Sequence, residues 1–145
     1  WNANLQELQR QLSAQLREDD HQTHYHLGIA FKEMGLLQRA IEEFKIALAD
    51  AELEFYGYLM LGVCYREMGD YTEAVEYLKK ALRIKPLSTK QYEDIYYQLG
   101  LTFEECGQTK DALEAFNKVS ELTGGQVSAE VQSKVEKLKG QLSGG

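Results

Sequence analysis

The feature that most constrains this fold is a segment that occurs three times along the chain. Each copy places an aromatic residue or histidine three positions before a Leu-Gly pair, and a second glycine follows seven positions after the first. The copies cover residues 24–35, 58–69 and 96–107. The glycines of the Leu-Gly pairs are separated by 34 and then 38 residues. The second glycines, and the alanines five positions after them, keep the same two separations. Such self-similarity is typical of a repeat protein, in which each unit packs mainly on its neighbours.

Hydrophobic periodicity predicts two helices in each unit. Apolar residues recur three and four positions apart on both sides of a turn glycine. The Leu-Gly glycines Gly28, Gly62 and Gly100 then lie inside helices, where glycine costs up to about 1 kcal/mol relative to alanine. We therefore expect the paired helix to approach closely at these positions. The predicted helices cover about 3–18, 22–34, 37–50, 54–68, 71–84, 89–106, 109–122 and 127–142.

The repeated residues resemble the tetratricopeptide repeat, which adds a second aromatic, an Ala-x3-Phe pattern and a proline on a period of 34. Residues 40–44 and 112–116 carry the Ala-x3-Phe pattern, and Pro86 closes the second repeat. Glu52 and Gly124 replace the proline in the other two repeats. The resemblance implies an all-α fold, a right-handed α-solenoid of antiparallel helix hairpins.

Three parts follow from this register. An N-terminal amphipathic capping helix covers residues 1–20, the repeats cover 21–124, and a C-terminal capping helix with a tail covers 125–145. The repeats themselves extend over about 21–54, 55–92 and 93–124. We expect the leucines of the first helix to pack on the first repeat or on a second copy, because an isolated helix of this length is marginal in water. The terminal residues, Trp1 and a Gly-Gly end, favour a piece of a longer protein.

The resemblance also implies a binding surface, because the first helix of each tetratricopeptide repeat lines a concave groove. Mapped onto this sequence, the predicted groove residues form an apolar and aromatic floor with charged edges. They are Tyr25, Ile29, Lys32, Tyr56, Leu59, Val63, Arg66, Glu67, Tyr97, Leu101, Glu104 and Glu105. Glu33 and Asp94 occupy further groove positions, so anions outnumber cations. We therefore expect an apolar or amphipathic partner segment with some basic residues.

The same mapping disfavours one branch of the family, whose members clamp an acidic chaperone peptide with lysine and asparagine. Tyr25, Ile29 and Val63 stand at three of these clamp positions, and Asp94 and Gln98 replace the basic pair of the third repeat. The sequence therefore argues against a co-chaperone of that type.

Composition excludes several other classes of protein. The formal net charge of −7 and a pI near 5.0 disfavour nucleic-acid binding, which needs a supply of cations on one face. No apolar stretch approaches the length of a membrane span, so direct membrane insertion is not expected. Nucleophile-elbow, phosphate-loop and zinc-protease motifs are missing, and the paired acids 42–43 and 104–105 do not face each other in a helix. We predict a protein that is no enzyme and needs no cofactor.

The histidines leave one minor alternative, a metal site, whereas the cysteines do not suggest one. His21, His24 and His26 lie near acidic residues and could bind zinc or nickel, but His24 occupies a packing position of the repeat. Cys64 and Cys106 lie in apolar helical patterns without CxxC spacing, which favours buried structural thiols and a reducing, cytoplasmic location.

These observations together predict a scaffold or adaptor that holds a protein or peptide in its groove. The alternative is a structural or self-assembling module that forms a homo-oligomer through its ends or its N-terminal helix.

Overall fold

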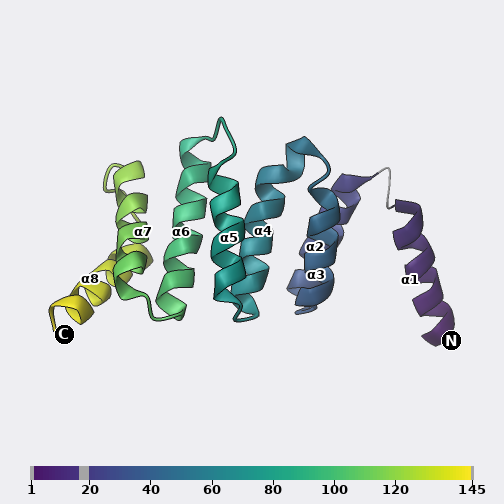
Figure 1. Ribbon diagram of the computed structural model, residues 1–145, viewed down its shortest axis with the longest axis horizontal. Coiled ribbons are helices and arrows are strands. Elements are labelled where there is room, and N and C mark those ends of the chain that lie inside the picture. The colour runs from purple at the N-terminus through teal and green to yellow at the C-terminus, as the bar shows by residue number, and fades with distance from the viewer. Residues whose placement is uncertain (1, 17–19, 145) are drawn as a thin grey trace.

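A computed structural model describes residues 2–16 and 20–144, and Figure 1 shows them as a row of helices. Within these ranges the structure contains helices and no strand, which confirms the predicted all-α class. The helices are α1 (Asn2–Leu16), α2 (His21–Glu33), α3 (Leu37–Ala47), α4 (Glu54–Glu67), α5 (Tyr71–Leu82), α6 (Thr89–Glu105), α7 (Thr109–Leu122) and α8 (Ala129–Ser143), with a 3₁₀ turn η1 (Ala51–Leu53) before α4. Each predicted helix is present close to its expected bounds, except that residues 17 and 18 lie outside the described ranges.

Three antiparallel hairpins form the body of the molecule. The helix pairs α2–α3, α4–α5 and α6–α7 contact each other most extensively, and each hairpin packs on the next in chain order. Helices α4 and α6 also contact each other directly. The first helices of successive repeats are therefore neighbours along one side of the stack, which places their side chains on a common face.

Glycine ends the first helix of each hairpin. Gly35, Gly69 and Gly107 have φ angles of 77°, 82° and 81°, a left-handed conformation that glycine adopts without a steric penalty. In the first hairpin the backbone N–H of Leu36 donates to Phe31 O at 2.8 Å, and the other two turns repeat this bond. The bond closes a Schellman motif, so each helix stops and the chain reverses at the predicted residue.

The glycines inside the Leu-Gly pairs allow the paired helices to approach closely. A Cβ atom added at Gly28, Gly62 or Gly100 would lie under 3 Å from a side chain of the second helix. The nearest side chains are, in the same order, Phe44 at 2.6 Å, Leu78 at 2.7 Å and Phe116 at 2.6 Å. These three side chains are fully buried. The structure confirms the predicted close contact and explains why a helix interior carries glycine here.

The insertion before the third repeat is taken up without breaking the stack. The connection between α5 and α6 (83–88) is no longer than that between α3 and α4 (48–53), and most of the extra length lies at the start of α6, which is the longest helix described. Ser88 caps α6 in a complete capping box: its Oγ accepts from Gln91 N at 3.1 Å, and Gln91 Oε1 accepts from Ser88 N at 2.9 Å. Asp70, which caps α5, makes only the first of these bonds, to Glu73 N at 3.3 Å.

The two terminal helices differ in how they pack. Val131 and Leu138 of α8 are buried in the cluster that contains Phe116 of α7, whereas Leu142 is exposed. Figure 1 shows α1 set apart from the hairpins, and Leu5 and Leu8 are about half exposed. The side chains of residues 12–16 lie outside the description. Leu5 and Leu8 are therefore not buried on the first repeat, and packing of this stripe on the repeat or on a second copy stays a prediction.

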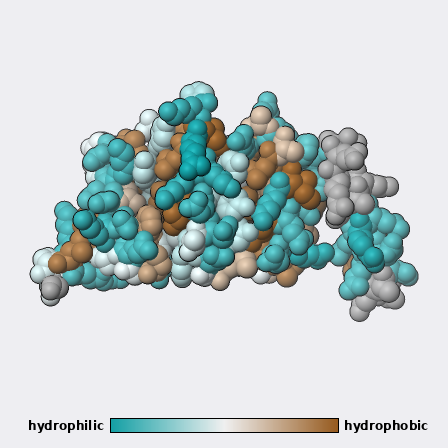
Figure 2. Space-filling model, in the orientation of Figure 1, coloured by the Kyte–Doolittle hydropathy of each residue, from teal (hydrophilic) through white to brown (hydrophobic). Residues whose placement is uncertain are grey.

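The surface in view in Figure 2 is mainly hydrophilic, with apolar patches between the helices. Among the described residues, no helix has the length and hydrophobicity that a membrane crossing requires.

Candidate interaction surface

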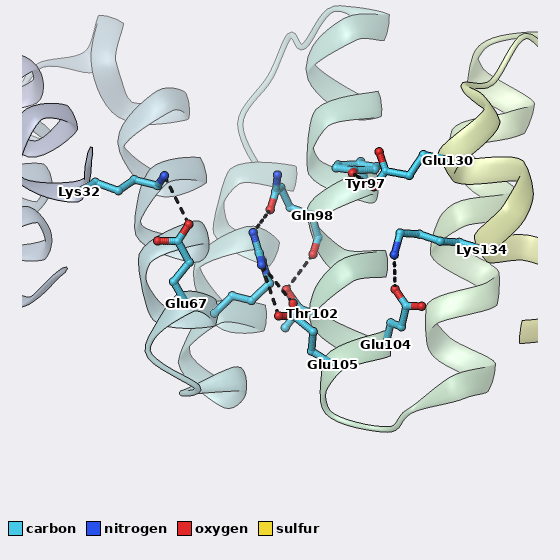
Figure 3. Close-up of polar contacts among 10 residues, drawn as sticks. Lys32, Glu67, Tyr97, Gln98, Thr102, Glu104, Glu105, Glu130 and Lys134 are labelled. Carbon is cyan, nitrogen blue, oxygen red and sulfur yellow. Dashed lines mark hydrogen bonds and ion pairs between the residues drawn. The ribbon is translucent and has the colours of Figure 1, made fainter. Parts of the chain in front are cut away.

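The predicted groove residues lie on α2, α4 and α6, and polar contacts join each of these helices to the next (Figure 3). Between α2 and α4, Lys32 Nζ lies 3.4 Å from Glu67 Oε1. Between α4 and α6, Arg66 Nη1 donates to Glu105 Oε2 at 3.1 Å, and Arg66 Nη2 donates to Gln98 Oε1 at 3.2 Å. Side chains from three repeats thus meet on one face, which we call the inner face.

Helix α8 continues this face beyond the third repeat. Lys134 Nζ lies 2.9 Å from Glu104 Oε1, and Lys137 Nζ lies 3.8 Å from the other oxygen of the same carboxylate. Tyr97 Oη donates a hydrogen bond to Glu130 Oε1 at 2.8 Å. The C-terminal helix therefore takes the place that the first helix of a fourth repeat would occupy.

Exposure within the ion pairs is uneven. The side chains of Lys32 and Arg66 are 18% and 15% exposed, whereas their partners Glu67 and Glu105 are 35% and 41% exposed. At the α8 end the order is reversed, because Glu104 is 16% exposed and Lys137 is 63% exposed. The inner face therefore presents the carboxylates of Glu67 and Glu105 to solvent over α4 and α6, and Lys137 over α8, where Glu130 is exposed as well.

Apolar and aromatic side chains accompany the ion pairs. Tyr56 is the most accessible of them at 45% exposed. Tyr25 packs against Phe44 with ring centroids 5.6 Å apart, and burial, with a smaller effect of Tyr56, raises the pKa of its phenol. Ile29 and Leu59 are half-buried.

Three predicted groove residues are less available than the mapping implied. Val63 is only 8% exposed and belongs to the core, so it offers a partner almost no surface. Tyr97 and Leu101 are half-buried against the cluster that α7 and α8 share. Burial, followed by the hydrogen bond to Glu130, raises the pKa of Tyr97 to about 12. Tyr97 therefore holds α8 in place as well as lining the inner face.

The mapping also missed residues that complete this face. Glu130, Lys134 and Lys137 lie on the predicted C-terminal capping helix, and Gln98 stands at one of the clamp positions. Helix α8 carries none of the repeat's marker residues, so no sequence pattern indicates that the inner face extends onto it. Only the spacing of its polar residues at helical intervals could have suggested a shared face.

The histidine and cysteine candidates occupy other places. His24 is fully buried between α2 and α3, where its Nδ1 pairs with a carboxylate oxygen of Glu43. Among the residues that the structure describes, no three His, Cys, Asp or Glu side chains gather as metal ligands would. Cys64 is buried as predicted, and burial raises its pKa to about 12. Cys106, which was also predicted to be buried, is half-buried, because it follows the last turn of α6 beside a pocket of about 620 Å³.

The helix hairpins and the shared inner face define an α-helical repeat scaffold. A family model described as tetratricopeptide repeat matches residues 19–87 and 57–123. The chain belongs to the tetratricopeptide repeat family. Proteins of this family serve in general as protein-interaction scaffolds and not as enzymes, so the broad class of this chain is a protein-binding scaffold.

Solved structures show the same fold. The tetratricopeptide repeat domain of Sgt2 from Aspergillus fumigatus superposes with a TM-score of 0.73 at 21% sequence identity, covering 88% of this chain and 82% of that chain. MamA of AMB-1 gives a TM-score of 0.68 at 24% identity, covering 92% of this chain and 71% of that chain. Identities this low are evidence for the fold alone. A comparison with curated proteins gives no match.

Proposed function

We propose that this chain is a scaffold or adaptor whose inner face holds an apolar or amphipathic segment with basic residues. The observation that carries the proposal is the uneven exposure of the ion pairs, in which the carboxylates of Glu67 and Glu105 lie further out than the cations that neutralise them. A lysine or arginine of a partner can reach these carboxylates without displacing Lys32 or Arg66. An acidic segment would meet the same carboxylates first and be repelled.

Aromatic side chains supply the anchor for such a segment. Tyr56 is exposed on α4, and Tyr25 lies near it on α2. Large aromatic side chains usually dominate the binding energy of peptide sites, because they bury much area at a small entropic cost. Leu59, one turn along α4 from Tyr56, extends the apolar floor.

The reversal of charge at α8 sets a direction for the partner. Its basic residues belong over α2, α4 and α6, and any acidic residue belongs near Lys137. Because charged rims mainly affect association rate and register, this polarity fixes orientation more than affinity.

The proposal is tested by selecting binders from a library of random dodecapeptides and measuring their affinity by calorimetric titration. Selected peptides should combine an aromatic or aliphatic residue with lysine or arginine. Tyr56→Ala should weaken their binding by about 2 kcal/mol, or roughly thirtyfold in Kd. Glu105→Gln should weaken it by about threefold and only at low salt, because exposed charge pairs contribute about 0.2 to 1 kcal/mol.

Met68→Ala is the matched control, because Met68 is exposed to the same extent as Tyr56 but lies at the turn between α4 and α5. It should bind every selected peptide like the parent. If Tyr56→Ala also binds like the parent, or if acidic peptides are enriched, the inner face is not the site that we propose.

Self-assembly is the second candidate, favoured by the exposed leucines of α1. Leu5 and Leu8 are uncovered in the monomer, and a helix with an apolar stripe gains by packing on a second copy. Sedimentation velocity over a concentration series separates the two functions. A dimer that disappears on Leu8→Glu substitution supports self-assembly, whereas a monomer at all concentrations excludes it.

The same proposal includes a cytoplasmic location, a protein partner in place of a nucleic acid, and a role without catalysis. The buried thiol of Cys64 supports a reducing, cytoplasmic setting. The acidic composition supports a protein partner over a nucleic acid. A binding role along the inner face needs neither a catalytic group nor a cofactor.

A further inference from the structure

A second charged surface lies away from the inner face, at the end of α5. Five of the 16 cationic residues and none of the 23 acidic residues fall between positions 79 and 90. Uncharged residues separate all of these cations but Lys79 and Lys80 along the chain, so the sequence shows no continuous basic run. The fold gathers them at the last turn of α5 and in the connection that leads to α6.

Most of these cations lack a carboxylate partner. Lys79, Lys80, Arg83 and Lys85 form no ion pair with any residue that the structure describes, and only Lys90 does, with Asp94 Oδ1 at 3.0 Å. Lys32 and Arg66 of the inner face, by contrast, are each paired with a glutamate. In a chain with a net charge of −7, this is where cations are concentrated and unpaired.

A pocket of about 480 Å³ opens at this end of α5. Its lining combines cations with an aromatic ring and an aliphatic side chain: Glu54, Tyr58, Lys80, Arg83, Ile84 and Lys85. Lys80 Nζ lies 4.8 Å from the centroid of the Tyr77 ring, a cation–π contact that restrains its position. None of these residues belongs to the predicted groove.

Helix electrostatics alone do not explain this arrangement. Cations in the last turn of a helix are favourable because of the helix dipole, which accounts for Lys79 and Lys80. Arg83 and Lys85 lie beyond that turn, and the dipole effect falls off within it. Their position beside a pocket with apolar lining is instead typical of a recognition site.

We infer that this basic corner, formed by Lys80, Arg83, Lys85 and the pocket between them, binds an acidic polypeptide segment that carries an apolar residue. Arg83 matches a carboxylate through two parallel hydrogen bonds, and the lysines supply charge around it. Tyr58 and Ile84 receive the apolar residue. The scaffold then holds two chains of opposite charge, a basic one on its inner face and an acidic one at this corner.

The surroundings of the corner favour a short peptide over an extended anionic surface. Glu54 lines the same pocket, and Asp50 and Glu52 immediately precede Glu54's helix. A flat membrane or a nucleic-acid duplex would bring its phosphates against these carboxylates as well as against the cations. A single flexible segment can place its acidic residues on the cations alone.

Fluorescence anisotropy with a labelled dodecapeptide of repeating Glu-Asp-Leu tests the inference on the full chain. The double variant Arg83→Glu/Lys85→Glu should bind this probe at least about tenfold more weakly, because two attractive charges become repulsive. Both residues are exposed and lie outside the helices, so the variant should melt like the parent. The control Lys110→Glu/Lys139→Glu changes the net charge equally at exposed, unpaired positions elsewhere and should alter binding less than twofold.

Two controls test whether binding of the acidic probe depends on its charge and on the basic corner. A dodecapeptide of repeating Gln-Asn-Leu should not bind, and Tyr56→Ala on the inner face should leave binding of the acidic probe unchanged. The inference is overturned if the control variant weakens binding as much as the corner variant, or if the acidic probe binds no better than the neutral one. It is also overturned if phosphatidylserine vesicles or single-stranded oligonucleotides bind through Arg83 while the acidic peptide does not.

Discussion

Substitution of Gly62 by alanine tests the packing that defines the repeat. The added Cβ atom would lie 2.7 Å from both Cγ and Cδ2 of Leu78 and 3.4 Å from Ala74 O. Leu78 is fully buried, so it cannot move away without disturbing its neighbours. Overpacking of this kind typically costs about 1 to 3 kcal/mol, while alanine gains about 1 kcal/mol of helix propensity over glycine. We expect Gly62→Ala to lower the free energy of unfolding by about 1 kcal/mol, and Gly62→Leu by more.

Urea unfolding monitored by circular dichroism measures this loss. Gly140→Ala is the matched control, because Gly140 also lies inside a helix but a Cβ there meets nothing within 4 Å. It should gain about 0.5 to 1 kcal/mol. Combining Gly62→Ala with Leu78→Ala should remove the clash, so alanine at position 62 should become neutral or stabilising in that background. If Gly62→Ala stabilises the parent as Gly140→Ala does, close helix contact is not the reason for the Leu-Gly pair.

Three further predictions concern single side chains. Ser88→Ala should lower the free energy of unfolding by about 1 kcal/mol in a urea titration, because the α6 capping box loses its side-chain acceptor. In the native protein a maleimide should label Cys106 and spare Cys64, whose thiol is buried with a pKa of about 12, as peptide mass spectrometry would show. Equal labelling would contradict the burial of Cys64. Tyr97 has a folded pKa of about 12 against an ordinary value of 10.0, so its contribution to stability is complete below pH 10 and is lost as pH rises through 12. In Tyr97→Phe the urea midpoint should therefore decrease less between pH 10 and pH 12 than it does in the parent. An equal decrease would show that the raised pKa of Tyr97 is not its cause.

The chain itself determined the number, order and register of the helices. The turn glycines act through local geometry, so their effect could be read from spacing alone. The apolar period then specified which side of each hairpin helix is buried. Gly62 shows how far this extends, because a costly glycine inside a helix predicted a close contact that the structure contains.

Tertiary structure decided what the surfaces offer. The family resemblance placed Val63 in the groove, but packing leaves it only 8% exposed. No local pattern could pair Arg66 with Glu105, 39 residues away, or bring Lys134 onto the inner face. Exposure and ion pairing depend on how far each helix is rotated and offset against its neighbours. That rotation is set by packing across the whole stack. The repeat pattern was therefore enough to predict the fold, whereas the interaction surface could be described only from the tertiary structure.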